Sequence, residues 1–315
     1  MIVTLTPNPS LDRAITIPAL RRGEVIRATS SRVDPGGKGV NVARALAAQG
    51  AATVAVFPRG GAEGHMMEDL LAEAGVRAVT TPVTGSMRMN ISVLEPDGTT
   101  TKLNEPGPTL TDQTVAELLG ATLASASPGG WVVGCGSLPP GAPVELYATL
   151  VSSAHAAGLR VAIDSSGEPM AHAVAARPDL IKPNHEELEE LVGARLDTLG
   201  DIRDAAAGLV ADGVETVAVS LGRDGALLVT QDAFVHANAT ISTPRSTVGA
   251  GDCMLAGLLH CLSRGLPPAD ALSAAVTWGA AAVTLPGSRV PGPADLEGIP
   301  VHVNTAPDLS RTLRR

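Results

Sequence analysis

Residues 246–254, with the sequence Ser-Thr-Val-Gly-Ala-Gly-Asp-Cys-Met, come directly before an apolar run rich in Ala and Leu that predicts a helix. The carboxylate of Asp252 therefore lies beside a helix N-terminus, where unpaired N–H groups and the peptide dipole favour an anion. Gly249 and Gly251 let that anion approach the backbone closely. A base beside an anion cradle fits phosphoryl transfer to a hydroxyl, in which the protein mainly positions reactants and neutralises charge. The same residues also fit an Asp that caps an ordinary buried helix.

Other polar and glycine-rich turns follow predicted strands, at the edge where open α/β sheets bind their ligands. The carboxylate of Asp12 is able to accept hydrogen bonds from two sugar hydroxyls. The alternative is that Asp12 is a turn or cap residue. The segment 36–41, Gly-Gly-Lys-Gly-Val-Asn, suits hydroxyl or phosphate contacts through its N–H groups and the Asn41 amide; the alternative is a plain tight turn. Arg88 is a forked donor suited to a phosphate, or a solvated surface cation.

Two later turns suit a nucleotide and a metal ion. Asn184 and Glu187 are three residues apart, so they are able to share a helix face and to hold Mg²⁺ through its waters, because this cation dehydrates reluctantly. The same pair also fits a capping box, with Asn in place of Ser. Residues 220–225 end a predicted strand and either lie under a nucleotide or form a hairpin into 226–230.

Short β-branched runs alternate with Ala-rich helical stretches along most of the chain, as in βαβ units around a largely parallel sheet. The predicted strands are 2–6, 53–57, 131–135, 160–164, 180–183 and 216–220. The predicted helices are 39–49, 64–74, 111–124, 144–157, 168–176, 185–192, 201–211, 252–263 and 268–284. We therefore expect an α/β fold with a doubly wound, mostly parallel sheet, and boundaries within about two to four residues.

Two segments, Ile15 to Val33 and Met87 to Leu103, read as strands with no helix between them. The second contains the turn residues Glu95-Pro-Asp-Gly98. We expect a small β-sheet, built from insertions at 13–34 and 86–105, that acts as a lid, because a lid excludes water that would hydrolyse the phosphate. A single domain then spans 1–303, and 304–315, with its arginines, forms a mobile C-terminal tail.

Composition narrows the function classes. The chain has 315 residues, 2% aromatic residues and a net charge of -9, so it lacks stacking platforms and the clustered cations needed for nucleic acid or an anionic membrane. Three cysteines without CxxC spacing predict buried free thiols rather than disulfides or structural zinc. The first residues resemble a strand rather than an apolar leader, and no run of about 18 apolar residues occurs, so we expect a cytoplasmic protein.

Some segments of the chain resemble three known motifs but lack an essential residue of each. Residues 34–39 resemble part of a P-loop, but Gly39 stands where a P-loop needs Ser or Thr, and Arg32, further upstream, stands where it needs its first Gly. The segments 134–139 and 249–254 both lack the third glycine of the dinucleotide fingerprint. His185-Glu-Glu-Leu-Glu189 lacks the second His of a zinc protease. These absences argue against a P-loop enzyme, a nicotinamide dehydrogenase and a metalloprotease.

The ordered set of motifs resembles the PfkB-type, ribokinase-like carbohydrate kinases, from Ile2 to about Arg289. The most specific match is Ser246 to Asp252. The supporting matches are 35–44 (Pro-Gly-Gly-Lys-Gly-Val-Asn-Val-Ala-Arg), 136–141 (Gly-Ser-Leu-Pro-Pro-Gly), 164–168 (Asp-Ser-Ser-Gly-Glu) and 182–187 (Lys-Pro-Asn-His-Glu-Glu). Within the family the chain is most similar to the phosphosugar branch, which contains 1-phosphofructokinase, tagatose-6-phosphate kinase and a minor type of 6-phosphofructokinase.

The resemblance implies a ribokinase-like domain with a β-sheet lid that also makes a homodimer contact, and ATP with Mg²⁺ as co-substrate. It implies that Asp252 is the general base and that Gly249, Ala250 and Gly251 form the anion hole. The residues that it implies for the sugar phosphate are Asp12, Arg27, Gly36, Gly37, Lys38, Asn41, Arg88 and Ser137. The residues that it implies for ATP and its metal are Lys182, Asn184, Glu187 (Mg²⁺ through water), Ser220, Leu221, Gly222, Gly225 and Ala282.

The chain departs from the family pattern at a few positions. Cys253 replaces the Ser that usually follows the base, Asp252. Cys135 replaces the Ser or Thr that is common before Gly136. Neither change removes an implied contact. Residues 22–27 align in more than one way, which leaves the role of Arg27 open. The segments 36–39 and 104–107 favour 1-phosphofructokinase, so the expected reaction converts fructose 1-phosphate to fructose 1,6-bisphosphate. The alternatives are tagatose-6-phosphate kinase, 6-phosphofructokinase and, from another class, a nucleotide-binding regulatory protein without turnover, against which the intact Asp252 and glycine cradle argue.

Overall fold

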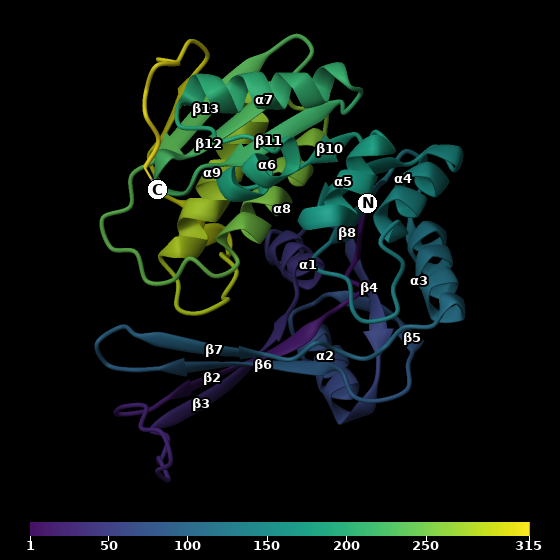
Figure 1. Ribbon diagram of the computed structural model, residues 1–315, viewed down its shortest axis with the longest axis vertical. Helices are drawn as coiled ribbons and strands as arrows, with labels where there is room; N and C mark the ends of the chain where they lie inside the picture. The colour runs from purple at the N-terminus through teal and green to yellow at the C-terminus, as the bar shows by residue number, and fades with distance from the viewer. Residues whose placement is uncertain (315) are drawn as a thin grey trace.

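The computed structural model describes residues 1–314, and Figure 1 shows a large sheet flanked by helices with a smaller sheet projecting from it. The strands of the large sheet are β1 (Ile2–Leu5), β4 (Thr53–Arg59), β5 (Arg77–Pro82), β8 (Trp131–Cys135), β9 (Arg160–Asp164), β10 (Leu180–Ile181), β11 (Thr216–Ser220), β12 (Ala226–Thr230), β13 (Phe234–Ala239) and β14 (Val301–Asn304). Their order is β14-β13-β12-β11-β10-β9-β8-β1-β4-β5. Pairing is parallel from β11 to β5 and antiparallel from β11 to β14, which confirms the predicted α/β fold.

Helices cover both faces of the large sheet. One face carries α3 (Asp112–Ser125), α4 (Leu146–Ala156), α5 (Gly167–Ala175), α6 (His185–Val192) and α7 (Leu199–Ala211). The other carries α1 (Lys38–Ala48), α2 (Gly61–Glu73), α8 (Ala250–Leu262) and α9 (Pro268–Val283). Alternation along β4 illustrates the division: Val54 and Val56 pack with the first set, whereas Ala55 and Phe57 pack with α1 and α2. Both faces are therefore apolar, as expected for a parallel sheet.

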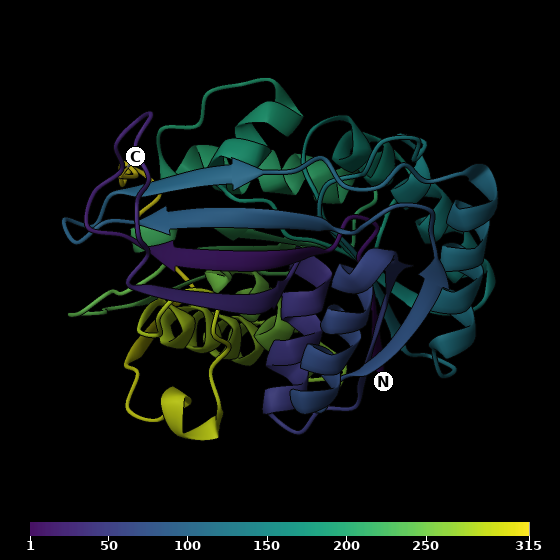
Figure 2. The same ribbon diagram turned by 90° about the horizontal axis from the view of Figure 1, so that it is seen from below.

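The small sheet consists of β2 (Ser10–Thr16), β3 (Ser30–Gly36), β6 (Arg88–Leu94) and β7 (Thr100–Asn104), in the order β3-β2-β6-β7. Figure 2 shows its long strands running side by side along one side of the molecule. Parallel pairing of β2 with β6 joins the two separated segments, and a turn at Glu95 to Thr99 joins β6 to β7. A small sheet built from two insertions is thus confirmed.

Predicted boundaries agree with the structure to within a few residues. Strand 131–135 and helix 185–192 match as predicted, while the strand predicted over 180–183 ends at Ile181, next to the sequence Lys182-Pro183, and Pro183 has no N–H for a ladder. Strands β5, β13 and β14 were not predicted. The three cysteines are free and buried, as expected, and no helix within residues 1–314 is long and apolar enough to cross a bilayer.

The prediction of a mobile tail after residue 303 is wrong for the described part of that segment. Asn304 ends β14, and Leu313 is buried against the main core. Asp224 accepts a hydrogen bond from the backbone N of Arg314 at 2.7 Å and pairs with the Arg311 side chain. Backbone bonds also join Leu199 to Arg311, so burial and hydrogen bonding hold the tail on the domain; Arg315 lies outside the described residues.

The glycine at position 134 is explained by packing rather than by a dinucleotide. A Cβ atom at Gly134 would lie 2.6 Å from Cδ1 of the buried Tyr147 and 3.0 Å from Cδ1 of Ile163. We therefore expect Gly134→Ala to lower the free energy of unfolding by about 1 to 3 kcal/mol, measured by urea denaturation. Gly120→Ala, on the exposed face of α3 with open space around it, is the matched control, and we expect it to be neutral or stabilising. Equal behaviour of the two variants would contradict the packing explanation.

Candidate active site

Helix α8 begins at Ala250, and its N-cap residue, Gly249, adopts a left-handed conformation with φ of 77°; no side chain caps this end by a hydrogen bond. Asp252 lies in the first turn, is 8% exposed, and its Oδ2 accepts a hydrogen bond from Nδ2 of Asn41 at 2.8 Å. The alternative that Asp252 is an ordinary capping residue is therefore wrong. Its carboxylate instead joins α8 to α1, across the interior of the molecule.

The surroundings of Asp252 raise its pKa to about 6, because burial disfavours the charged form and Asp164 adds repulsion. The hydrogen bond from Asn41 and the charges of Lys182 and Lys38 lower the pKa, without cancelling the effect of burial. A carboxylate with such a pKa is ionised at neutral pH and is a stronger base than an exposed Asp. This residue is thus suited to accept a proton from an alcohol.

A buried carboxylate, Asp164, pairs with two lysines at the carboxyl end of the large sheet. Its Oδ1 is 2.9 Å from Nζ of Lys38, and its Oδ2 is 3.1 Å from Nζ of Lys182. Lys38 also lies 3.4 Å from Oε1 of Glu187. Burial opposes ionisation of Asp164, but Lys182 and Lys38 outweigh it and hold its pKa below the ordinary value. Two cations thereby stand near the N-terminus of α8, where Nζ of Lys182 is 3.5 Å from the position of a Cβ on Gly251.

A cavity of about 320 Å³ lies between the small sheet and the main domain, with Asp252 in its wall. The predicted site residues that line it are Asp12, Gly37, Lys38, Asn41, Arg88, Ser137, Glu187, Gly249 and Asp252. Residues from strands β2 and β6, from α1 and from α8 therefore meet in one place. Sugar-sized ligands match such a volume, and most of the lining is polar or glycine.

Register in the small sheet places Asp12 of β2 directly opposite Asn90 of β6. Oδ1 of Asp12 accepts hydrogen bonds from Oγ of Ser10 at 2.7 Å and from Nδ2 of Asn90 at 3.1 Å. Burial raises the pKa of Asp12, against the effect of those bonds. A Cβ on Gly36 would collide with this carboxylate, so a larger residue there would displace the Asp12 side chain. Asp12 thus has a fixed orientation, and a second oxygen remains for a ligand.

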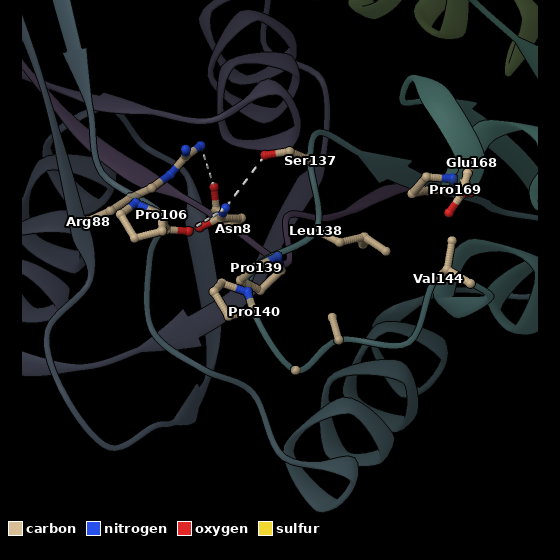
Figure 3. Close-up of a pocket in the computed structure, with 12 residues that line it drawn as sticks. Asn8, Arg88, Pro106, Ser137, Leu138, Pro139, Pro140, Val144, Glu168 and Pro169 are labelled. Carbon is tan, nitrogen blue, oxygen red and sulfur yellow. Dashed lines mark hydrogen bonds between the residues drawn. The ribbon is translucent and has the colours of Figure 1, made fainter.

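Arg88 lies where this cavity meets a second one of about 590 Å³ (Figure 3). Its Nη2 donates to the backbone O of Asn8 at 2.9 Å, and the Asn8 amide in turn reaches Ser137 at 3.5 Å. Figure 3 shows Arg88 and Asn8 on one side of the second cavity and Glu168 on the other. The guanidinium is therefore held in place by one strong bond and keeps donors for an anion.

Arg27 and Asn184 line neither cavity, whereas Glu187 lines the smaller one. Arg27 is exposed in the loop between β2 and β3. Asn184 and Glu187 form the capping box of α6, with Oδ1 of Asn184 accepting from the N of Glu187 at 2.8 Å and Oε2 of Glu187 accepting from the N of Asn184 at 2.8 Å. The capping alternative is thus confirmed for this pair. One oxygen of Glu187 still faces Lys38 and the smaller cavity.

The turn after β11 is the hairpin that the sequence allowed. Ser220 ends β11, Leu221 is buried, and Gly222 and Gly225 both have positive φ where the chain returns into β12. Ala282 of α9 is 1% exposed and belongs to the core between α9 and the sheet, so its side chain does not face a cavity. Its expected place in a nucleotide site is therefore not supported by its burial.

Sequence reasoning missed several residues of the site. Asp164 appeared only as part of a motif, although its position directly after a predicted buried strand is the signal that marks a ligand edge. Asn8, Ser10 and Asn90 also line the smaller cavity. Asn90 gave no signal of its own, because only the pairing of β2 with β6 brings it to Asp12.

Comparison with known proteins agrees with this geometry. Residues 7–295 match the pfkB family carbohydrate kinase description. The chain is 37% identical to a 1-phosphofructokinase of Rhodobacter capsulatus over 313 residues, covering 98% of this chain and 99% of that protein. It is 36% identical to the ATP-dependent 6-phosphofructokinase isozyme 2 of Escherichia coli, covering 92% and 94%. The tetrameric inhibited form of phosphofructokinase-2 from Escherichia coli superposes with a TM-score of 0.89 at 35% identity, covering 95% and 97%. The chain belongs to the pfkB family of carbohydrate kinases.

Proposed function

We propose that this protein transfers the γ-phosphoryl group of ATP to the C6 hydroxyl of fructose 1-phosphate, giving fructose 1,6-bisphosphate. The observation that carries the kinase proposal is the shared cavity that joins Asp252, the N-terminus of α8 and the hydroxyl-binding groups Asp12 and Asn41. Similarity to 1-phosphofructokinases over nearly the whole chain supports the acceptor. Fructose 6-phosphate is the second candidate, because a 6-phosphofructokinase is also similar over most of the chain.

In this proposal Asp252 takes the proton of the attacking hydroxyl while the N–H groups of Gly249, Ala250 and Gly251 stabilise the moving phosphoryl group. Lys38 and Lys182, held by Asp164, neutralise phosphate charge. Asp12 and Asn41 orient the sugar, with Gly36 and Gly37 leaving space beside them. Arg88 and Ser137 hold the phosphate that is already on the substrate.

The same proposal places the adenine nucleotide along Ser220 to Gly225, at the carboxyl edge of β11, with Lys182 on its phosphates. Mg²⁺ would neutralise charge on those phosphates. One available donor is the Glu187 carboxylate. One of its oxygens is used in the capping box, and the other lies 3.4 Å from Nζ of Lys38 beside the cavity. This set fits an ion that keeps most of its waters, so Glu187 would hold it through water, with Asn184 fixing the carboxylate.

We further propose that the small sheet is a lid and that its outer side forms a homodimer contact. Three large apolar residues of this segment are exposed: Leu20 at 46%, Val25 at 91% and Leu103 at 57%. Burial of such residues between two copies removes apolar surface from water. Sedimentation of the protein and of Leu103→Lys tests this, and an unchanged molecular mass would contradict it.

A comparison of acceptors tests the proposed function. We expect ADP release, coupled to a second enzyme, to give the highest kcat/KM with fructose 1-phosphate among fructose 1-phosphate, fructose 6-phosphate and tagatose 6-phosphate. A higher value with either other sugar phosphate would replace the acceptor and keep the kinase. Nucleotide binding without turnover on any of them would instead favour a regulatory protein.

The raised pKa of Asp252 predicts an acid limb in the pH profile of kcat/KM, which reports groups of the free enzyme. Protonation removes the base, so we expect kcat/KM to rise with pH and to level off above a midpoint of about 6. Initial rates with saturating ATP and limiting sugar phosphate, at constant ionic strength, measure this limb. A profile that stays flat down to pH 4.5 would contradict a catalytic base with a pKa of about 6.

Arg88 is expected to select the sugar phosphate. We expect Arg88→Ala to raise KM for the sugar phosphate by about 10- to 100-fold, because a charge-assisted bond to phosphate is lost, and to leave KM for ATP nearly unchanged. Steady-state kinetics with each substrate varied in turn measure the two constants. Arg13→Ala, an exposed arginine of β2 in the same sheet, is the control. Equal losses for both substrates would move Arg88 out of the sugar-phosphate site.

A further inference from the structure

Arg44 of α1 is a buried cation whose hydrogen bonds go to neutral acceptors. It is 8% exposed, and its Nη1 donates to the backbone O of Pro35 at 2.9 Å, to Oδ1 of Asn41 at 3.1 Å and to the backbone O of Ser288 at 3.3 Å. Within residues 1–314 it forms no ion pair at 4.0 Å or less, and burial lowers its pKa. A buried guanidinium without a direct counterion is costly, so its position calls for an explanation beyond packing.

Arg44 acts on the amide of Asn41, which lies three residues earlier on the same face of α1. A side-chain amide has two orientations, and its neighbours decide between them. Here Oδ1 faces the guanidinium and Nδ2 donates to Oδ2 of Asp252 at 2.8 Å. The flipped amide would place an oxygen against the carboxylate and an NH₂ group against the cation, and both contacts would be repulsive.

We propose that Arg44 is a positioning residue for phosphoryl transfer. It fixes the Asn41 amide so that this amide holds Oδ2 of Asp252, which leaves Oδ1 of Asp252 for the acceptor hydroxyl. The inference rests on the proposed function of Asp252. Within the described residues Oδ1 of Asp252 has no hydrogen-bond partner, which agrees with its assignment to the acceptor hydroxyl. The chain of contacts runs from Arg44 through Asn41 to Asp252, so Arg44 touches neither substrate nor the reacting atoms.

Several other titratable groups lie near Asp252 and Arg44. The charged groups facing Asp252 are Asp164 on β9, Lys38 on α1 and Lys182 after β10. The titratable groups facing Arg44 are Asp34, Asp12, Arg32 and Cys253. None of them contacts the Asn41 amide in the described structure, whereas Arg44 does. Loss of Arg44 therefore acts on Asp252 through Asn41 and is separable from a general loss of charge.

A double-mutant cycle on the acid limb of kcat/KM tests the proposal. We expect Arg44→Met to move the midpoint upward by about one pH unit, because the flipped or mobile amide no longer stabilises the carboxylate. In an Asn41→Leu background the chain of contacts from Arg44 to Asp252 is already broken. We therefore expect Arg44→Met to move the midpoint there by less than about 0.3 pH unit. Additive shifts in the two backgrounds would overturn the proposal, since Arg44 would then act by another route.

Two further variants complete the experiment. Arg32→Met removes a neighbouring cation that pairs with Asp34, and we expect it to leave the midpoint unchanged. Arg44→Lys keeps a donor, and we expect its midpoint to lie closer to that of the unmodified protein than the midpoint of Arg44→Met does. Arg44→Leu replaces Arg44→Met in the same cycle if Arg44→Met does not fold. In either case Asn41→Leu is expected to raise the midpoint, because Asp252 loses the Asn41 donor, and an unchanged midpoint in Asn41→Leu would overturn the proposal. Absence of turnover in the unmodified protein would instead refute the proposed function.

Discussion

Asp252→Asn is expected to lower kcat by about three orders of magnitude while ATP and sugar phosphate still bind. An amide has nearly the shape of the carboxylate but cannot take the hydroxyl proton. The N-terminus of α8 and the lysines near it remain in place, so binding is expected to change little. Coupled ADP release measures kcat, and isothermal titration calorimetry measures the two dissociation constants.

The matched control is Asp270→Asn, which changes an exposed carboxylate in the first turn of α9, as Asp252 lies in the first turn of α8. We expect this control to keep the activity of the unmodified protein. Near-normal turnover in Asp252→Asn would refute the proposed base. Loss of both binding and turnover would point to a collapsed site rather than to a missing base.

The same variant is expected to be more stable than the unmodified protein at pH 7. The pKa of Asp252 is raised to about 6 in the folded state from an ordinary value of 3.8, so ionisation of this residue opposes folding as pH rises from 3.8 to 6 and remains unfavourable above that range. Replacing it with a neutral amide removes that cost. Urea denaturation at pH 7 gives the sign, and a less stable Asp252→Asn would show that the carboxylate stabilises the fold.

Asp164→Asn is expected to lower the free energy of unfolding by about 3 to 5 kcal/mol at pH 7. Asp164 is fully buried, and its loss leaves the ammonium of Lys182, which is 3% exposed, without its counterion. Lys38 is less affected because it is also 3.4 Å from Glu187. Urea denaturation monitored by circular dichroism measures the change, and turnover is expected to fall with it because both lysines lose their anchor.

The control for Asp164 is Asp179→Asn, which removes a half-buried carboxylate that pairs with Arg160 and His155 nearer the surface. We expect a smaller cost there, of about 1 kcal/mol, because water screens these charges. Equal losses in the free energy of unfolding for the two variants would contradict the expectation that a buried ion pair costs more to break than a partly exposed one. The pKa of Asp164 is lowered, so its contribution is present above 3.8 and is lost as pH falls through its lower value in the folded state.

The order of the helices and strands could be predicted from local pattern. Runs such as Trp131 to Cys135 and 185–192 match because hydrophobic period and capping residues are properties of neighbouring residues. Strands β13 and β14 carry weak signals, since His and Asn residues interrupt their apolar residues. The tail was mistaken for a mobile segment because its anchors, Asp224 and the N-terminus of α7, lie far away in the chain.

The sequence by itself determined the fold class, the small sheet and the chemical types of the site: a carboxylate at a glycine-lined helix start, a glycine turn with Lys38 and Asn41, and a forked cation at Arg88. These are features of contiguous residues. Tertiary structure alone decided that Asp252 is held by Asn41 and buried enough to raise its pKa to about 6, and that Asp164 joins Lys38 to Lys182. The Asn41–Asp252 and Lys38–Asp164 contacts join residues 211 and 126 positions apart in the chain, and no local pattern of side chains specifies such burial and charge pairing.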